Sequence, residues 1–342
     1  MASPPCVSIA PMMERTDRYY RVMMRGITKR TLLYTPMITA PAILRGPGER
    51  LLDFDEIEHP LSLQLGGDNP AMLAECAKRA EARGYDEVNL NIGCPSDRVQ
   101  GGNFGACLMR DPQRVADCYA AMADIVEIPI TIKHRIGVDE LDRYEDMLNF
   151  VDTVAAAGCT RFSVHARKAW LSGLNPKQNR TVPPLRHAEI HQLKRDRPQL
   201  WIETNGGITD LEETSAHLAK LDAVMIGRAA WDDPMLFQTV DRRFFGSTEP
   251  LATRRSVVEA FLPWAAKWLA EGRKSVGVLR NLLSLFKGQP GTKVYKQRIS
   301  ALCQRPPADP GELRRAILGA LDEVESIQEE FRRHRAAEAS GA

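Results

Sequence analysis

Short runs of apolar and β-branched residues alternate along the first two thirds of the chain with longer segments of helical periodicity. Eight runs have the length and character of buried strands: 7–12, 32–38, 61–67, 87–93, 130–137, 161–166, 200–207 and 223–228. Between them, residues 69–84 and 111–126 carry apolar side chains at spacings of three and four. Asn69 and Asp111 each precede a proline as N-caps, and Gly84 follows the first segment, so both segments are predicted to be helices.

A strand followed by a helix, repeated eight times, is typical of a closed (β/α)8 TIM barrel and not of an open doubly wound sheet. The second strand and its connection to the third are the least regular, because residues 44–60 have the composition of a loop or short hairpin. Residues 246–253 are rich in turn formers, and three further helical patterns follow them. The sequence therefore predicts an α/β fold with a catalytic barrel domain over 1–245 and a helical domain over 246–342.

The composition is that of an ordinary globular protein, with 44% hydrophobic and 26% charged residues among 342. No apolar run approaches the roughly 18 residues of a membrane span, and the N-terminus lacks the order of a signal peptide, so we expect a cytoplasmic protein without a membrane partner. The seven cysteines include no C-x-x-C pair, which indicates neither a zinc site nor a disulfide framework. The net charge of +2 hides an uneven distribution, because residues 273–308 include eight Lys or Arg and no Asp or Glu.

Polar residues and glycines stand near the ends of six successive predicted strands, at the edge where barrels of this kind carry their chemistry. They are Gln64, Asn91, Cys94, Lys133, His165, Asn205, Gly206, Gly207, Gly227 and Arg228. Each alone has a structural explanation, such as a satisfied interior amide, a capped core histidine or an outer-face lysine. Together they indicate a site, because buried polar groups cost free energy unless they are paired.

The glycines that end the last two strands suit a phosphate site, where backbone N–H groups face the anion and Arg228 adds a bidentate contact. No G-x-G-x-x-G follows the first strand, so a Rossmann dinucleotide site is not supported. A cofactor that resembles a mononucleotide fits better. Lys133 would then stabilise negative charge on a reduced flavin ring, with Gln64 and His165 hydrogen-bonded to its edge or tail.

Seven segments carry a resemblance to a known family. They are VSIAPMM (7–13), LQLGG (63–67), NLNIGCPSDRVQGGNFGACLM (89–109), IKHRIG (132–137), VHARKAWLSGLNPKQNR (164–180), NGGI (205–208) and IGRAAW (226–231). In order and spacing they resemble the tRNA-dihydrouridine synthases over residues 7–237, and the helical tail also fits. The third and fifth segments most resemble the bacterial DusA branch of this family.

The resemblance implies FMN bound in the barrel, NADPH as reductant, and reduction of the C5–C6 double bond of uridine in the tRNA D loop, at nucleotides 20 and 20a. It also implies, by position, which residues hold FMN, and that Cys94 is the proton donor. The implied FMN ligands are Pro11, Met12, Met13, Gln64, Lys133, His165, Asn205, Gly206, Gly207, Gly227 and Arg228.

Reduction of a uracil ring needs a hydride at C6, which flavin N5 supplies, and a proton at C5. A thiol suits the second role, because thiols titrate near pH 8.5 whereas an aspartate is usually ionised at neutral pH. Gly93 and Pro95 favour a sharp turn that directs Cys94 into the barrel mouth, and we expect Asn91 to hydrogen-bond the edge of the base. The later glycines, from Gly101 on, permit a loop that closes over the substrate. The structural alternative is a buried thiol comparable to Cys118.

A uridine inside folded tRNA must be flipped out to reach a barrel mouth, and phosphate contacts must offset the cost. Candidate contacts lie in residues 273–308 and in a second acid-free group after the sixth strand. That group comprises Arg167, Lys168, Lys177, Arg180 and Arg186. By resemblance, Lys177, Arg180, Lys293 and Lys296 contact tRNA directly, whereas charge runs in general are more often solvated faces.

Two other functions are compatible with parts of this pattern. A flavin barrel acting on a free pyrimidine, such as a dihydroorotate or dihydropyrimidine dehydrogenase, would use the same cofactor site but would leave the basic segments unexplained. A tRNA-binding protein without catalysis would have no use for FMN. The sequence favours the synthase, which we expect to act as a monomer and to need no metal.

Overall fold

The computed structural model describes residues 4–96, 103–307 and 309–340. The chain divides into two compact units. The first comprises Met1–Asp17 and Arg30–Gly227, and the second comprises Arg18–Lys29 and Arg228–Ala342. The sequence analysis draws its boundary at residues 246–253, and its division of cofactor and tRNA binding between two domains stays a prediction.

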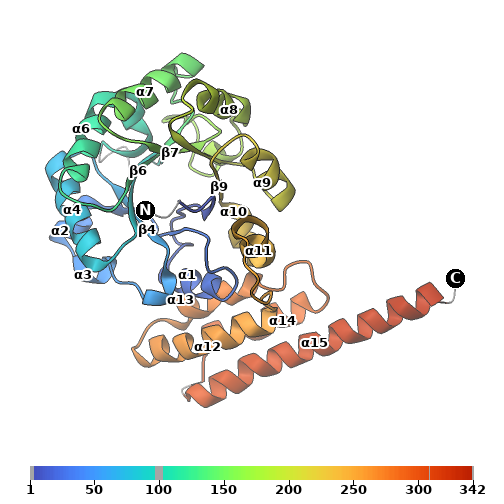
Figure 1. The fold of residues 1–342 in the computed structure, drawn as a ribbon. Helices are drawn as coiled ribbons and strands as arrows, with labels where there is room; N and C mark the ends of the chain where they lie inside the picture. Colours follow the sequence, from blue (N-terminus) through green and yellow to red (C-terminus); the bar gives the residue numbers. More distant parts are fainter. Residues whose placement is uncertain (1–3, 97–102, 308, 341–342) are drawn as a thin grey trace. The chain divides into compact units, whose positions relative to one another are not determined.

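The first unit is a barrel of parallel strands that helices surround, seen as a ring in Figure 1. The strands are β1 (Val7–Ile9), β2 (Leu33–Tyr34), β3 (Ile38–Thr39), β4 (Leu61–Gly66), β5 (Glu87–Ile92), β6 (Ile130–Arg135), β7 (Arg161–His165), β8 (Trp201–Asn205) and β9 (Ala223–Ile226). They are paired in the order β1, β9, β8, β7, β6, β5, β4, β2, and β3 pairs with β4. The path closes at Leu32, which donates to Val7 O (3.2 Å) and accepts from Ile9 N (3.0 Å). The predicted (β/α)8 barrel is confirmed.

The second predicted strand, 32–38, is interrupted at Pro36, which separates β2 from β3. Proline has no N–H to donate to a ladder. Here the Gln64 N–H donates to the hydroxyl of Thr35 (3.0 Å), so a side chain takes the place of a backbone acceptor. The expectation of a loop or hairpin over 44–60 is wrong in part, because short helices occupy much of this connection.

The helices of the first unit follow the strands in alternation. They are α2 (Ala40–Arg45), α3 (Gly48–Leu51), α4 (Pro70–Arg83), α6 (Pro112–Ala123), α7 (Tyr144–Ala156), α8 (His187–Asp196) and α9 (Leu211–Leu218), with 3-10 turns η1 (Glu56–Glu58), η2 (Gly105–Arg110) and η3 (Gln178–Arg180). Both predicted N-caps are confirmed: Asn69 accepts from Met72 N (3.0 Å) and Asp111 from Arg114 N (3.1 Å). Gly84 ends α4 at a φ of 94°, in the left-handed conformation that favours glycine.

The barrel strands turn apolar side chains outward against the helices and polar side chains inward. Inside, the carboxylate of Glu87 accepts from Ser62 Oγ (2.9 Å) and pairs with Arg161 (2.7 Å). A second buried carboxylate, Glu203, accepts hydrogen bonds from the hydroxyls of Ser8 and Ser163. Except for Arg161 Nε, which has no hydrogen-bond partner among the described residues, these groups satisfy one another, so the deep part of the barrel is a packed polar core.

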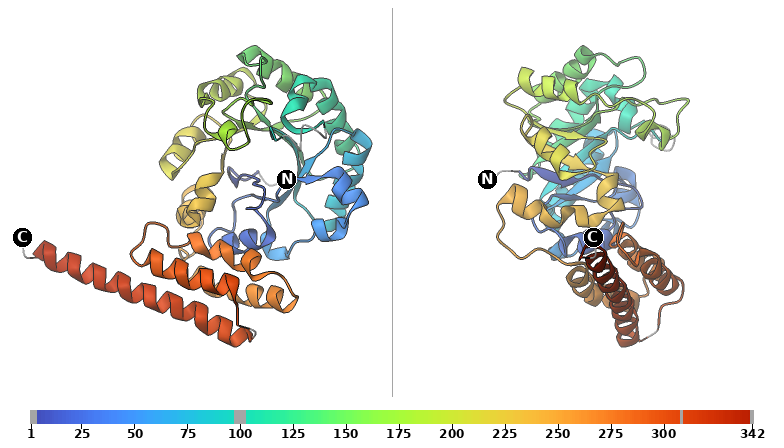
Figure 2. Two further views of the ribbon diagram at one scale, coloured as in Figure 1. Left: turned by 180° about the vertical axis from the view of Figure 1, so that it is seen from behind. Right: turned by 90° about the vertical axis from the view of Figure 1, so that its right-hand side faces the viewer.

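The second unit is helical, as predicted for the C-terminal part of the chain. Its elements are α1 (Arg18–Arg25), α10 (Arg228–Asp232), η4 (Pro234–Thr239), α11 (Val240–Phe245), α12 (Arg254–Ala270), α13 (Ser275–Leu279), η5 (Arg280–Ser284), α14 (Thr292–Gln304) and α15 (Pro310–Ser340). Trp268 of α12 is fully buried and packs against Tyr19 and Phe261. Figure 2 shows α12, α14 and the long α15 side by side. Within the described ranges, no helix is both long enough and apolar enough to cross a membrane.

Candidate active site

Side chains from five successive strands, β4 to β8, gather at the carboxyl end of the barrel. They are Gln64, Asn91, Lys133, His165 and Asn205. The strand register sets Asn91 beside Lys133 and His165 beside Asn205. Two hydrogen bonds join the group: Asn91 Nδ2 donates to Gln64 Oε1 (2.8 Å), and Lys133 Nζ donates to Asn205 Oδ1 (3.2 Å). The structure thus brings together residues that the sequence analysis selected one by one.

Cys94 stands on a turn that the side chain of Asn91 holds in place. Asn91 Oδ1 accepts from the N–H groups of Gly93 and Cys94, both at 3.0 Å. On the other side, Cys94 O accepts from Ala106 N (3.0 Å). The partly exposed thiol therefore sits on a backbone that is anchored twice. Because Asn91 Oδ1 is engaged with this turn, a contact between Asn91 and the base stays a prediction.

The loop that follows Cys94 falls largely outside the described residues. Gly101 and Gly102, which we expect to let this loop close over the substrate, are among the residues left undescribed. Gly105 opens η2 with a left-handed φ of 75°.

Lys133 is a cation in a confined, predominantly positive setting. Burial lowers its pKa to about 8, and the guanidinium of Arg135 acts in the same direction, against the opposing effect of Glu203. The ammonium group is mostly protonated at neutral pH but loses its proton more readily than an ordinary lysine. Such a group can stabilise an anion at the barrel mouth.

His165 is neutral in the folded protein, because burial and then the charge of Arg135 hold its pKa well below the ordinary value. Its Nδ1 accepts from Arg167 N (3.2 Å), so the proton lies on Nε2. A Cβ atom at Gly206 would come within 3.3 Å of that nitrogen. The protonated edge of the imidazole therefore lies beside the glycine turn that follows β8.

Gly206 and Gly207 form that turn with φ angles of +115° and +78°. The left-handed φ at Gly207 favours glycine there, and a Cβ would in addition displace the end of the Leu185 side chain, whose Cδ1 it would meet at 2.4 Å. His187 Nε2 donates to Gly206 O (2.8 Å), and His187 Nδ1 lies 2.9 Å from Thr204 Oγ1. The turn is thus held from outside by a histidine that the sequence analysis does not name.

The remaining predicted cofactor ligands lie at the first and last strands. Pro11, Met12 and Met13 follow β1, and the Met13 side chain is 58% exposed. Gly227 follows β9, where a Cβ would lie 3.6 Å from that of Ala10. Arg228 begins α10 in the second unit, so its contact with the glycine turn stays a prediction.

Arg135 is a site residue that the sequence analysis misses. It ends β6 with 4% of its surface exposed, and its Nε donates to Gly93 O (2.8 Å), next to Cys94. The signal was present in the sequence, because Arg135 stands two residues after Lys133 and a strand turns alternate residues to the same face.

The basic group after β7 is not free of acidic partners in space. Lys168 and Arg186 both pair with Asp142, at 2.8 and 2.5 Å. The side chains of Lys177 and Arg180, at the start and end of η3, are exposed. Two members of the group are thus neutralised by a carboxylate from a distant part of the sequence.

The segment 273–308 contains no acidic residue, but it also has an acidic partner from elsewhere in the chain. Arg298 of α14 pairs with Glu323 of α15 (2.9 Å). Lys293 and Lys296 are exposed on α14. The positions expected to touch tRNA are therefore available, although their contact with RNA stays a prediction.

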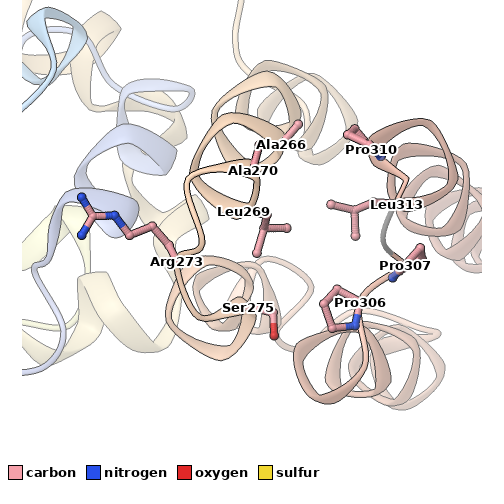
Figure 3. Close-up of a pocket in the computed structure, with 9 residues that line it drawn as sticks. All are labelled: Ala266, Leu269, Ala270, Arg273, Ser275, Pro306, Pro307, Pro310 and Leu313. Atoms are coloured by element: carbon pink, nitrogen blue, oxygen red, sulfur yellow. The ribbon is translucent and has the colours of Figure 1, made fainter.

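A cavity of about 320 Å³ in the second unit is lined by none of the predicted cofactor ligands, nor by Cys94, Lys293 or Lys296. Its wall includes Leu269 and Leu313, which point toward each other, whereas the Arg273 side chain extends away (Figure 3). In the described part of the chain, no group of three or more His, Cys, Asp or Glu side chains is placed to hold a metal ion.

Comparison with known proteins identifies the family. The family model for dihydrouridine synthase matches residues 8–318. A tRNA-dihydrouridine(20/20a) synthase of Synechocystis sp. is 54% identical over 311 residues, which are 91% of this chain and 93% of the relative. Proteins of the same name from Shewanella oneidensis and Escherichia coli are 52% and 50% identical, over 86% and 91% of this chain and 87% and 90% of their own. Cys94 and Lys133 lie at the mouth of a closed barrel, and the sequence matches show that the chain belongs to the dihydrouridine synthase family.

Proposed function

We propose that this protein reduces uridine to 5,6-dihydrouridine in the D loop of tRNA, at nucleotides 20 and 20a. The observation that carries the proposal is the anchored Cys94 turn, held by Asn91 at the same barrel mouth as Lys133. The names of relatives that share half or more of the sequence support the reaction and the position of the nucleotide. We infer a cytoplasmic protein, because its proposed substrate is tRNA, and its being a monomer stays an expectation from the sequence.

The residues at the mouth fit FMN as the cofactor. The left-handed turn at Gly206 and Gly207 stands where the sequence predicts the phosphate site, and Lys133 offers a cation for the electron-rich side of a flavin. Gln64, Asn205 and the Nε2–H of His165 supply neutral hydrogen-bonding groups between them. When bound, FMN supplies the hydride that reduces C6 of the base, and NADPH restores it.

The protein itself contributes the proton for the reaction and holds the proton donor in position. Cys94 Sγ gives its proton to C5 of the base on the face opposite the flavin. Asn91 holds the Cys94 backbone, so the segment that carries the thiol cannot move away from the mouth without breaking two hydrogen bonds. This arrangement contributes mainly by orientation.

Binding of RNA is assigned to the exposed cations. We propose that Lys177 and Arg180 of the barrel and Lys293 and Lys296 of the helical domain contact tRNA phosphates. These contacts offset the cost of flipping the uridine out of its stack. In this proposal the barrel domain holds FMN and the helical domain, 246–342, holds tRNA.

Replacement of the acid tests the assignment directly. Cys94→Ala should retain FMN and its reduction by NADPH, yet lose at least about 10²-fold in dihydrouridine formation on unmodified tRNA, because general acid catalysis typically contributes that much. The measurement is dihydrouridine mapping after incubation with FMN and NADPH, beside flavin absorbance in stopped flow. Cys118→Ala, which removes a buried thiol of α6, is the matched control and should stay active. Full activity of Cys94→Ala, or turnover of free uracil or orotate in place of tRNA, would contradict the proposal.

A further inference from the structure

Arg135 is a buried cation that no carboxylate neutralises among the ion pairs of the described residues. Its side chain donates to main-chain carbonyl groups instead. Nε donates to Gly93 O (2.8 Å), and Gly93 precedes the proposed acid. Hydrogen bonds from a charged donor contribute about twice as much as neutral ones, so this bond holds the turn firmly.

The other end of the same guanidinium reaches the loop between β7 and α8. Nη1 donates to Lys168 O (2.9 Å) and Asn179 O (3.1 Å), with Arg167 O farther away at 3.4 Å. One side chain therefore bridges the Cys94 turn and the loop between β7 and α8, which is far from that turn along the chain.

Asn179 organises the loop whose carbonyl groups accept hydrogen bonds from Arg135. It is fully buried, accepts from Trp170 N (2.8 Å), and donates to Trp170 O (2.9 Å) and Leu174 O (3.0 Å). Its neighbours along the chain include Lys177 and Arg180, the loop's proposed tRNA contacts. The side chain of Asn179 thus organises the loop that is proposed to meet RNA, and its main-chain carbonyl group links this loop to the guanidinium that holds the catalytic turn.

The charge of Arg135 makes this link costly to break. Burial lowers its pKa to about 10, so the group is charged at neutral pH, and the cations Arg167 and Arg180 repel it. The carbonyl oxygens of the turn and of the loop are its solvation shell. If either segment moves away, a buried cation loses part of that shell, which is unfavourable in a confined site.

We infer that Arg135 is a positioning residue that couples the β7–α8 loop to Cys94, so that the loop conformation that binds tRNA also sets the position of the thiol. The inference rests on the proposed function, in which Cys94 is the acid and the loop meets RNA. It assigns to Arg135 no contact with the substrate. Its physical basis is that one guanidinium donates hydrogen bonds to both Gly93 O and Asn179 O.

Arg135→Lys tests the coupling, because a lysine keeps the charge but cannot hold both segments at once. We expect the rate of Cys94 alkylation by iodoacetamide to rise several-fold in the protein without tRNA, read by mass spectrometry against Cys6 as an internal reference. In single-turnover assays the maximal rate should fall by about 10²-fold, the effect of a small misplacement of a reacting group. FMN reduction by NADPH should change little.

The matched control is Arg197→Lys. Arg197 also binds through a fork, with Nε and Nη2 each 2.6 Å from Asp152, but it follows α8 at its carboxyl end. It should alter neither alkylation nor the maximal rate. Circular dichroism and the melting temperature verify that each variant is folded.

A double-mutant cycle with Asn179→Ala separates coupling from simple support. If Asn179 acts on Cys94 through Arg135, its substitution should speed alkylation in the wild-type background and add little in Arg135→Lys. Additive effects of the two substitutions, or an alkylation rate in Arg135→Lys within twofold of wild type, would overturn the inference. Failure of the proposed function would look different, since wild-type protein would then leave uridine in tRNA unreduced while the alkylation cycle could still be measured.

Discussion

Lys133 and Cys94 illustrate how a residue's chemistry depends on neighbours from other strands. Lys133 is joined to Asn205 of β8 and lies on the same strand face as Arg135, so its proton is held less tightly than in water. The sequence analysis could select both residues from strand-end positions and the family resemblance. It could not supply the low pKa of Lys133, which results from burial and from the adjacent guanidinium.

The pH dependence of FMN binding tests the role of Lys133. Its folded-state pKa of about 8 means that the cation is present below pH 8 and is lost as pH rises above it. FMN affinity should therefore fall by about twofold from pH 7 to 8 and then weaken by up to about tenfold per pH unit if the ammonium is essential. Fluorescence titration of the FMN-free protein measures this. Lys133→Met should bind weakly with no such decline, and an equally steep decline in that variant would refute the assignment.

At the scale of elements, the alternation of apolar and polar positions predicted the barrel strands and helices well, because periodicity is a local property. The predictions that failed concern residues whose surroundings come from another element. Pro36 splits a strand whose composition looks continuous, and Glu323 of α15 neutralises Arg298 in a segment that contains no acid of its own. A charge run in the sequence is therefore a poor measure of a charged surface.

The exposed lysines of α14 should contribute to RNA binding more than their paired neighbour. Lys293→Ala/Lys296→Ala should weaken tRNA binding and reduce the slope of log affinity against log salt by about one for each lost phosphate contact. Filter binding at several salt concentrations measures the slope. The control Lys78→Ala/Lys220→Ala removes the same charge from exposed barrel positions. Arg298→Ala should have a smaller effect, because Glu323 already holds that guanidinium. Equal slopes for the α14 double variant and wild type would count against RNA contact there.

At the scale of the whole molecule, the barrel unit encloses most of the chain's histidines. Burial lowers the pKa of His134, His165, His187, His191 and His217. His134 lies between the sheet and α7, in ring contact with Phe150 and Phe162, and its pKa falls to about 4. The fold therefore favours the neutral form of these imidazoles.

Stability should fall on mild acidification. Since the folded-state pKa values lie below the unfolded value of about 6.5, the unfolded chain binds more protons between them, and stability is lost as pH falls from 6.5 toward 4. His134 alone accounts for on the order of 3 kcal/mol of this loss. Glu203, whose pKa is raised by burial, opposes it. Melting temperatures from pH 8 to 4 measure the trend, which His134→Asn should flatten. A melting temperature that stays constant or rises toward pH 4 would contradict this account.

The sequence by itself determined the barrel, the order of its strands and the candidate residues at the strand ends, because each follows from periodicity and spacing within short segments. Only the tertiary structure decided which charged and polar groups contact each other. Arg135 bridges Gly93 and Asn179, Asp142 neutralises Lys168 and Arg186, and His187 supports Gly206. These contacts join residues tens of positions apart, so they depend on how the folded segments meet and leave no periodic trace in the sequence.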